Sequence, residues 1–224
     1  TAAFLVALFQ NLLAHPAPPT RGATAIRALV IAPTRELAVQ IHHDAMLLGR
    51  NTGLRIAVVF GGVDYEKQRR QLESGVDILI GTPGRIIDYY KQHVFDRKHV
   101  RVMVLHEADR MFDLGFISDI RYLLRRMPAP DKRLNLLFSA TLSQRVLELA
   151  YEHMNEPRLT RIEPDKMTVE RIRQIIYFPS NSEKPRLLVG MLKHMDPTRS
   201  MVFVNTRRAA EDVENLLRDN GINA

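Results

Sequence analysis

Short apolar runs alternate with helical patterns along most of this chain, and this alternation constrains its fold more than any other feature. Runs rich in β-branched and other apolar residues predict strands at 26–33, 54–62, 76–83, 100–109, 135–141, 174–180 and 200–206. Between most of them the apolar residues recur three or four positions apart, as in 117–127 and 187–195, which predicts helices. Strands and helices that alternate in this way favour right-handed βαβ crossovers. We therefore expect an α/β doubly wound fold with a mostly parallel sheet.

The composition is that of a globular chain with a modest excess of basic residues. Its 224 residues are 46% hydrophobic, enough for one large domain or two smaller ones. The formal net charge of +7 favours polyanionic partners only weakly, because ordinary surfaces also reach this value. Since the chain has no cysteine, disulfides and thiolate metal sites are excluded, and a cytoplasmic location is expected.

The opening stretch 1–19 is apolar enough to resemble the core of a signal peptide. No basic segment precedes it, Gln10 and Asn11 interrupt it, and it is too short to span a bilayer. We expect a buried helix whose beginning has been cut away.

The alternation breaks at 155–173, where Pro157, Pro164 and many charged residues occur. We predict a first unit at 1–158, a linker at 159–173 and a second unit at 174–224. The second unit is too small for an independent core, so we expect it to be the beginning of a larger domain.

Each predicted strand of the first unit ends in a small, polar or turn-forming cluster. The clusters are PTREL (33–37), GG (61–62), TPGR (82–85), HEAD (106–109) and SAT (139–141). If the sheet is parallel, the clusters meet along one edge, which is where ligands bind in such folds.

Each cluster also has a purely structural explanation. Thr34 suits a helix N-cap, Pro83 and Gly84 form turns, and Thr141 with Gln144 fits a capping box. As a set, however, the clusters favour a binding edge. Gly-rich turns and helix N-termini expose backbone N–H groups, and Arg35 and Arg85 add fixed positive charge, which suits nucleic acid phosphates.

The acidic residues after the fourth run point to phosphoryl chemistry. Glu107 and Asp109 follow a buried strand, where carboxylates could hold hydrated Mg²⁺ or orient a water molecule. The structural alternative for such an acidic pair is a helix cap or a loop salt bridge.

In this order, PTREL, GG, TPGR, EAD, SAT and MVFVNT resemble the motifs of the DEAD-box RNA helicases over essentially the whole chain. The segment 110–143 looks like the bacterial RhlB-type branch, which is associated with the RNA degradosome. The resemblance implies a first RecA-like domain without its phosphate-loop strand, followed by the start of a second RecA-like domain. It also implies ATP and Mg²⁺ as cofactors, RNA unwinding in RNA turnover, RNA as the partner and a degradosome endoribonuclease as a second partner.

The resemblance also assigns roles to individual residues. Glu107 would polarise the attacking water, and Asp109 would connect to Ser139 and Thr141, which couple the nucleotide state to RNA binding. Thr1, His106 and Glu107 would lie at the ATP and Mg²⁺ site, the ion being held through water. The residues implied to contact the RNA backbone are Pro33, Thr34, Arg35, Gly61, Gly62, Thr82, Pro83, Gly84, Arg85, Asn205 and Thr206.

The chain departs from the family pattern in two ways. It has no G-x-x-x-x-G-K-[ST] loop, and its Thr1 resembles the last residue of that loop. Later motifs of the second domain are also missing, so we expect no ATP hydrolysis from the chain alone. The second departure is His106, which stands where the family has its first acidic residue. Because Mg²⁺ prefers oxygen ligands to imidazole, we expect a penalty of about 10- to 100-fold in metal placement.

Alternative interpretations remain open. A different metal centre at 106–109 is disfavoured because neighbouring strand residues point to opposite faces, and 41–45 (IHHDA) fits a solvated helix face better than a ligand set. His106 favours a second hypothesis, a catalytically inactive RNA-binding or adaptor protein on a helicase scaffold. A domain that binds only protein would show no salt-sensitive RNA affinity.

Overall fold

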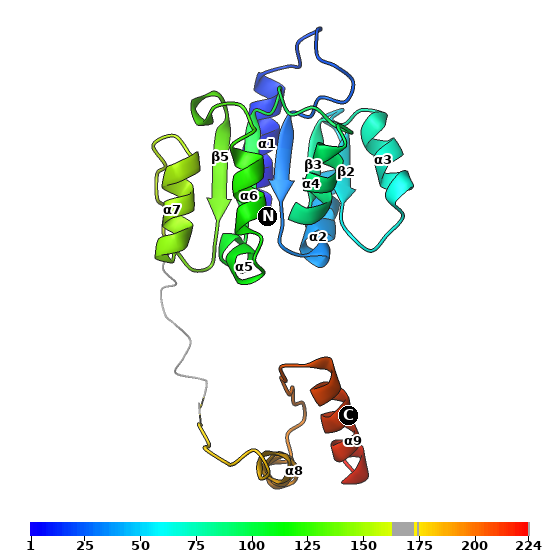
Figure 1. Ribbon diagram of the computed structural model, residues 1–224, viewed down its shortest axis with the longest axis vertical. Helices are drawn as coiled ribbons and strands as arrows, with labels where there is room; N and C mark the ends of the chain where they lie inside the picture. The colour runs from blue at the N-terminus through cyan, green and yellow to red at the C-terminus, as the bar shows by residue number, and fades with distance from the viewer. Residues whose placement is uncertain (163–172, 174, 224) are drawn as a thin grey trace. The chain divides into compact units, whose positions relative to one another are not determined.

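The computed structural model describes residues 1–162, 173 and 175–223 (Figure 1). It divides into two compact units, Thr1–Thr160 and Arg161–Ala224, and each is described by itself. The predicted linker at 159–173 lies largely outside the described residues, so the predicted domain boundaries remain a prediction.

The first unit alternates strands and helices as the sequence predicts. Its elements are α1 (Ala2–Ala14), β1 (Ala28–Ile31), α2 (Arg35–Gly49), β2 (Ile56–Val59), α3 (Tyr65–Glu73), β3 (Ile78–Gly81), α4 (Pro83–Lys91), β4 (Val102–His106), α5 (Ala108–Asp113), α6 (Ile117–Leu124), a short 3₁₀ turn (Pro130–Lys132), β5 (Leu134–Phe138) and α7 (Gln144–His153). The five strands form one sheet in the order β2-β3-β1-β4-β5, and every neighbouring pair is parallel. The predicted doubly wound parallel α/β sheet is confirmed.

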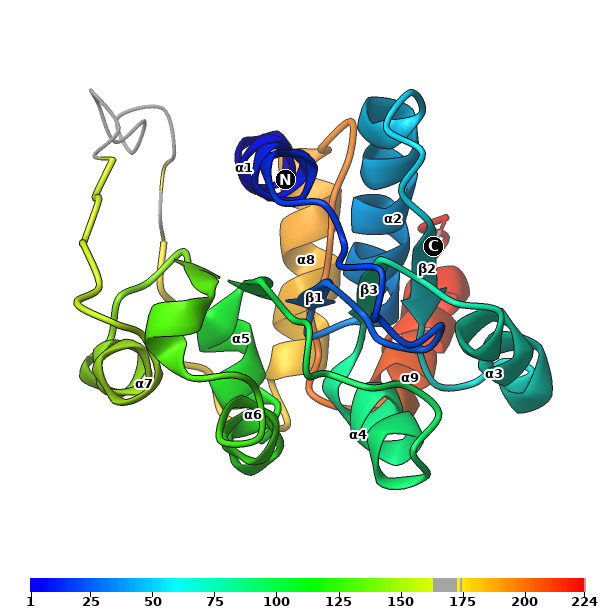
Figure 2. The same ribbon diagram turned by 90° about the horizontal axis from the view of Figure 1, so that it is seen from above.

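Two hydrophobic cores hold the helices against the two faces of the sheet. On one face, Leu29, Ile31 and their neighbours pack against α4, α6 and α7. On the other face, Ala28 and Val30 pack against α1 and α2 (Figure 2). Because side chains alternate along a strand, consecutive residues of β1 belong to different cores. Strands buried on both faces read as continuous apolar runs, which is why the sequence revealed them.

The opening helix is part of the second core. Phe4, Leu5, Leu8 and Leu12 of α1 are almost completely buried, as the expected buried helix requires. Of the described helices, none combines the length and the apolar character that a membrane crossing needs.

The edge strand β5 differs from the central strands. All four residues of β1 and of β3 are buried, whereas every residue of β5 is only half-buried. Within the described residues, β5 pairs with β4 alone, so its outer row of backbone groups has no strand partner.

The second unit contains α8 (Lys184–Met195) and α9 (Arg207–Asp219). The end of α9 was anticipated: Gly221 has φ 77°, and Ile222 N–H donates to Leu217 O at 2.9 Å, as in a Schellman cap.

The strands predicted at 174–180 and 200–206 were wrong for the described residues. Residues 175–180 and 200–206 contain no strand, and Phe178 and Phe203 are 91% and 86% exposed. A strand is stabilised by a neighbouring strand and by packing on its faces. The described part of this unit offers these runs neither, so apolar character alone did not produce strands.

Candidate nucleotide and RNA site

The parallel register brings the predicted motifs to one edge of the sheet. Ile31 is level with Gly81 of β3 and with Leu105 of β4, and Leu105 is level with Leu137 of β5. Gly81 is in turn level with Val59 of β2. The segments that follow the strands therefore lie side by side at the carboxyl edge. The predicted residues found in these segments are Pro33, Thr34, Arg35, Gly61, Gly62, Thr82, Pro83, Gly84, Arg85, His106, Glu107, Asp109, Ser139 and Thr141.

Two predicted residues lie in the second unit, and Thr1 starts the helix α1, whose first turn reaches the end of β4 through the contact between Phe4 and His106. Asn205 and Thr206 belong to the second unit, where Thr206 caps α9 by accepting a hydrogen bond from Ala209 N–H at 3.1 Å. Thr1 is the N-cap of α1 and makes no side-chain capping bond.

Helix starts form two of the motifs. Thr34 caps α2 through a hydrogen bond from Leu37 N–H at 3.3 Å, as predicted, and Pro83 occupies the first turn of α4 after the N-cap Thr82. Both helices therefore direct unpaired N–H groups of their first turns toward the carboxyl edge.

Aromatic rings support both predicted RNA-contacting arginines. The Arg35 guanidinium lies 4.8 Å from the centroid of Phe60, and Arg85 lies 4.8 Å from Tyr65 and 5.5 Å from Tyr89. Arg85 also donates to the Tyr89 hydroxyl at 3.2 Å. Such contacts orient a guanidinium without neutralising it. Both cations thus keep their charge for an anionic ligand.

Sequence reasoning had missed these three rings. Phe60 directly precedes Gly61, and Tyr65 begins α3. Their positions beside the motifs were visible, but nothing in the sequence showed that they stack on arginines.

His106 faces the core that contains α1. Because β4 alternates, His106 shares a face with Val102 and Val104, and its ring lies 5.3 Å from Phe4 and 6.0 Å from Phe138. Its Nδ1 is buried without a hydrogen-bond partner among the described residues. Burial lowers the pKa of His106, so the imidazole is neutral near pH 7.

Glu107 follows β4 as the N-cap of α5 and has a left-handed backbone conformation, with φ 55° and ψ 57°. This conformation is costly for a residue other than glycine and is found preferentially at functional sites. It turns the chain sharply from the strand into α5, so that Glu107 and His106 do not share a face.

Asp109 joins the loop after β4 to the loop after β5. Its Oδ2 accepts hydrogen bonds from the backbone N–H and the hydroxyl of Thr141, both at 2.9 Å. Its own N–H donates to Ser139 Oγ at 3.1 Å, and that hydroxyl donates to Thr141 O at 2.7 Å. The capping box predicted for Thr141 and Gln144 was wrong: α7 begins at Gln144 after the N-cap Ser143, and the Thr141 hydroxyl is bonded to Asp109 instead.

The Asp109 network predicts a pH-dependent stability. Burial raises the pKa of Asp109, but the hydrogen bonds from Thr141 outweigh it and leave the pKa below its ordinary value. The ionised Asp109 therefore stabilises the folded state above its ordinary pKa of about 3.9. This contribution to the free energy of unfolding is lost as the pH falls through the lower pKa that Asp109 has in the folded state. We expect Thr141→Val to lower the free energy of unfolding by about 1 kcal/mol at pH 7.

Urea unfolding at several pH values checks this expectation. The difference between the wild type and Thr141→Val should shrink as Asp109 is protonated in both, and Thr141→Ser, which keeps the hydroxyl, should behave like the wild type. A difference that does not change with pH would mean that Asp109 is not the partner that matters.

The geometry offers few direct metal ligands. No group of three or more His, Cys, Asp or Glu side chains that could hold a metal ion occurs in the part of the chain that the structure covers. Oδ2 of Asp109 is occupied by Thr141, and His106 points into an apolar core. Glu107 is therefore the acidic side chain of this cluster that fits a hydrated Mg²⁺, with the remaining positions left to water and phosphate oxygens.

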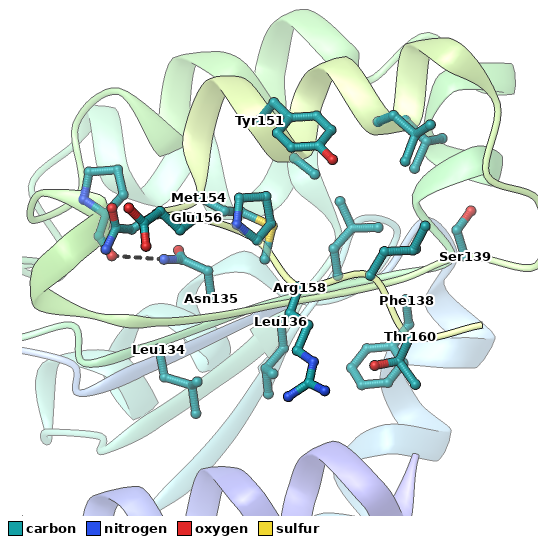
Figure 3. A pocket seen from close by; sticks show the side chains of 18 of the residues that line it. Leu134, Asn135, Leu136, Phe138, Ser139, Tyr151, Met154, Glu156, Arg158 and Thr160 are labelled. Atoms are coloured by element: carbon teal, nitrogen blue, oxygen red, sulfur yellow. Dashed lines mark hydrogen bonds between the residues drawn. The ribbon is translucent and has the colours of Figure 1, made fainter. Parts of the chain in front are cut away.

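A cavity of about 490 Å³ lies along the open side of β5 (Figure 3). Leu134, Leu136 and Phe138 of β5 line it, together with α7 and the chain up to Thr160, and Ser139 lies at its rim. The cavity thus combines apolar side chains with the unpaired backbone of β5, next to the Asp109 network.

Comparisons with known proteins agree with this geometry. A family model described as "DEAD/DEAH box helicase" matches residues 1–149. The chain is 57% identical over 222 residues to "ATP-dependent RNA helicase RhlB" of Xanthomonas axonopodis pv. citri (strain 306), covering 99% of this chain and 39% of the relative. It is 54% identical over 221 residues to the protein of that name from Aeromonas salmonicida (strain A449), covering 99% of this chain and 52% of the relative.

A solved structure supports the fold. The crystal structure of a DEAD box protein from the hyperthermophile Methanococcus jannaschii aligns with a TM-score of 0.64 at 30% identity, covering 98% of this chain and 56% of the other. The chain thus spans roughly half or less of the length of these relatives. Both the RecA-like fold and the likeness to the RhlB-type branch are confirmed, and the chain belongs to the DEAD/DEAH box helicase family.

Proposed function

We propose that this chain is part of an ATP-dependent RNA helicase, which couples ATP binding and hydrolysis to local unwinding of RNA duplexes. The observation that carries the proposal is the convergence of five separate motifs on the carboxyl edge of one parallel sheet. Family membership supports the same reading, because relatives 52–57% identical to this chain are named as RNA helicases.

The RNA backbone would lie across the first part of this edge. Arg35 and Arg85, held by aromatic rings, would contact phosphates together with the N-termini of α2 and α4. Gly62, with φ 81°, lies close to Arg35 and allows the polymer to approach the backbone. Asn205 and Thr206 would add contacts from the second unit.

The nucleotide would lie beside β4 and β5. Phe4 contacts His106, so the N-terminus of α1 lies near the carboxyl end of β4, where helix N–H groups suit phosphates. Bound Mg²⁺ would neutralise charge on the phosphates, and Glu107 would orient the attacking water. The cavity along β5 has the apolar lining and free backbone groups that a further strand with a phosphate-cradling loop requires.

The finer parts of the proposal follow the RhlB-type likeness. They are a role in RNA turnover, a degradosome endoribonuclease as partner, and a cytoplasmic location. The rival function is a catalytically inactive RNA-binding or adaptor protein, and the observation that favours it is His106, which supplies no oxygen ligand and is turned into a core.

RNA binding tests the proposal at the arginines. We expect Arg85→Gln to weaken binding of single-stranded RNA about 10-fold, because the substitution removes a contact with a phosphate. The same loss should flatten the slope of log K against log salt by about 0.7. Fluorescence anisotropy at several salt concentrations measures both quantities. The exposed Arg50, at the end of α2, offers the matched control Arg50→Gln. Affinity and salt dependence equal to those of the wild type would exclude Arg85 from the RNA path.

A further inference from the structure

The edge of the sheet opposite the candidate site carries a second set of cations. Residues 92–101 lead into β4 and residues 125–133 lead into β5, so both segments lie at the amino ends of the strands. Lys91, at the end of α4, reaches the same edge because α4 begins at the carboxyl end of β3 and crosses the sheet. Neither the proposed RNA path nor the proposed nucleotide site uses these segments.

Two tyrosine rings hold three cations at this amino edge. Arg126 lies 3.7 Å and Lys91 lies 5.5 Å from the centroid of Tyr122, and Arg97 lies 4.9 Å from that of Tyr90. The two rings are in edge contact, with centroids 6.1 Å apart. We call Lys91, Arg97 and Arg126, with Tyr90 and Tyr122, the amino-edge patch.

The charge of the amino-edge patch is not neutralised locally. Arg97 donates to Arg126 O, and Arg126 donates to Tyr122 O at 3.1 Å, so backbone carbonyls fix both guanidinium groups. Among the described residues, none of the three cations is within 4.0 Å of a carboxylate, in contrast to Arg121 and Arg125, which are both paired with Glu152. Lys91 and Arg126 are exposed.

A basic pocket continues this surface. A cavity of about 230 Å³ is lined by Arg27, Lys98, His99, Arg101 and Lys132, and Pro128 connects it to Arg126 along the chain. Asp96 lies 4.0 Å from Lys98, Asp131 lies 3.2 Å from Lys132 and Asp77 lies 4.0 Å from Arg27, so these three cations are partly neutralised. Arg101 is not, and its Nε is buried without a hydrogen-bond partner in the described chain. The pocket thus has room for an anionic group beside Arg101, which has no carboxylate within 4.0 Å in the described chain.

We propose that the amino-edge patch and this pocket form a second binding surface for the phosphate backbone of single-stranded RNA. The proposal rests on the proposed RNA-binding function, which supplies the polymer. Cations from several chain segments match the regularly repeated charge of a polynucleotide, whereas an acidic peptide would need an equally long run of carboxylates. Since strands of four or five residues separate the two edges by about 17 Å, one RNA strand can reach both.

RNA length separates the two surfaces. The protein, expressed with its flanking coding sequence, is titrated with RNAs of about 10 and about 30 nucleotides, the shorter sized for one surface. We expect Arg97→Gln with Arg126→Gln to weaken binding of the longer RNA about 10-fold and to flatten its salt slope by about 1.4, leaving the shorter RNA unaffected. Lys91→Gln alone, which removes only an exposed cation, should flatten the slope by about 0.7.

The matched control is Arg50→Gln with Arg70→Gln, which removes two exposed arginines from the ends of α2 and α3. Wild-type affinity of the double patch variant for both RNAs would overturn the proposal and point to an acidic protein partner instead. Equal losses for both RNAs, with a native circular dichroism spectrum, would overturn it by placing the patch on the main RNA path. Failure of the wild type to bind the shorter RNA would instead reject the proposed function itself.

Discussion

Glu107→Gln is expected to lower RNA-stimulated ATP hydrolysis by about 10²- to 10⁴-fold, the range by which a positioned general base accelerates such reactions. Gln has nearly the shape of Glu and can occupy the same left-handed position, but it cannot accept a proton from water. The segment 106–109 contains two acidic side chains, because position 106 is a histidine. Asp109 is hydrogen-bonded to Thr141, which leaves Glu107 as the carboxylate that can act on water. The loss should therefore appear in kcat.

The measurement is steady-state ATPase activity with saturating RNA, using the protein expressed with its flanking coding sequence. ATP binding and RNA affinity should stay within about twofold of the wild type, because neither depends on proton transfer. Glu148→Gln, at an exposed position of α7, controls for the loss of one carboxylate. ATPase activity that survives Glu107→Gln would show that Glu107 does not polarise the attacking water, and the role that the family resemblance assigns to it would be wrong.

The fold could be predicted largely because apolar patterning decides it. The strands β1 to β4 fall inside runs recognised from the sequence, and β5 (Leu134–Phe138) overlaps the run predicted at 135–141 but begins one residue before it and ends three residues before its end. Their parallel pairing follows from the helices between them. The same reasoning failed at 200–206, where an equally apolar run has no strand beside it in the described residues. Apolar character records a tendency to be buried, but the neighbouring strand supplies the hydrogen bonds.

The candidate site was predictable in composition and less so in geometry. Parallel topology alone places Arg35, Arg85, Glu107 and Thr141 at one edge. The partners of these side chains come from distant segments: Asp109 for Thr141, Tyr65 for Arg85, and Phe4 for His106. Local patterns explain turns and caps, so they assigned Thr141 to a capping box. They could not show that a carboxylate on another loop binds the hydroxyl more favourably than the helix end does.

His106→Asp is expected to have two opposite effects in the same protein. An aspartate restores an oxygen ligand at the end of β4. The Mg²⁺ concentration that gives half-maximal ATP hydrolysis should therefore fall by about 10- to 100-fold. The substitution also removes a ring that packs between Phe4 and Phe138 and puts a carboxylate beside an apolar core, which should cost about 1–3 kcal/mol of stability. Magnesium titrations of ATPase activity and urea unfolding measure the two effects separately.

Two further substitutions separate metal binding from packing. His106→Asn loses the ring as His106→Asp does but adds no charge. Stability should therefore fall, and the Mg²⁺ concentration needed for ATP hydrolysis should not. His106→Phe keeps three aromatic rings together and eliminates the buried, unpartnered Nδ1, so it should raise stability by about 1 kcal/mol and leave ATP hydrolysis no better than in the wild type.

The pattern across the four proteins decides between the two functions proposed for the chain. If only His106→Asp gains activity, the chain belongs to a working ATPase in which histidine weakens Mg²⁺ binding. The helicase function then stands. If the wild type and His106→Asp hydrolyse ATP at equal and robust rates, the ion does not depend on this position. If all four proteins bind RNA and none hydrolyses ATP, histidine at the end of β4 belongs to a scaffold that has lost turnover, and the adaptor function replaces the helicase.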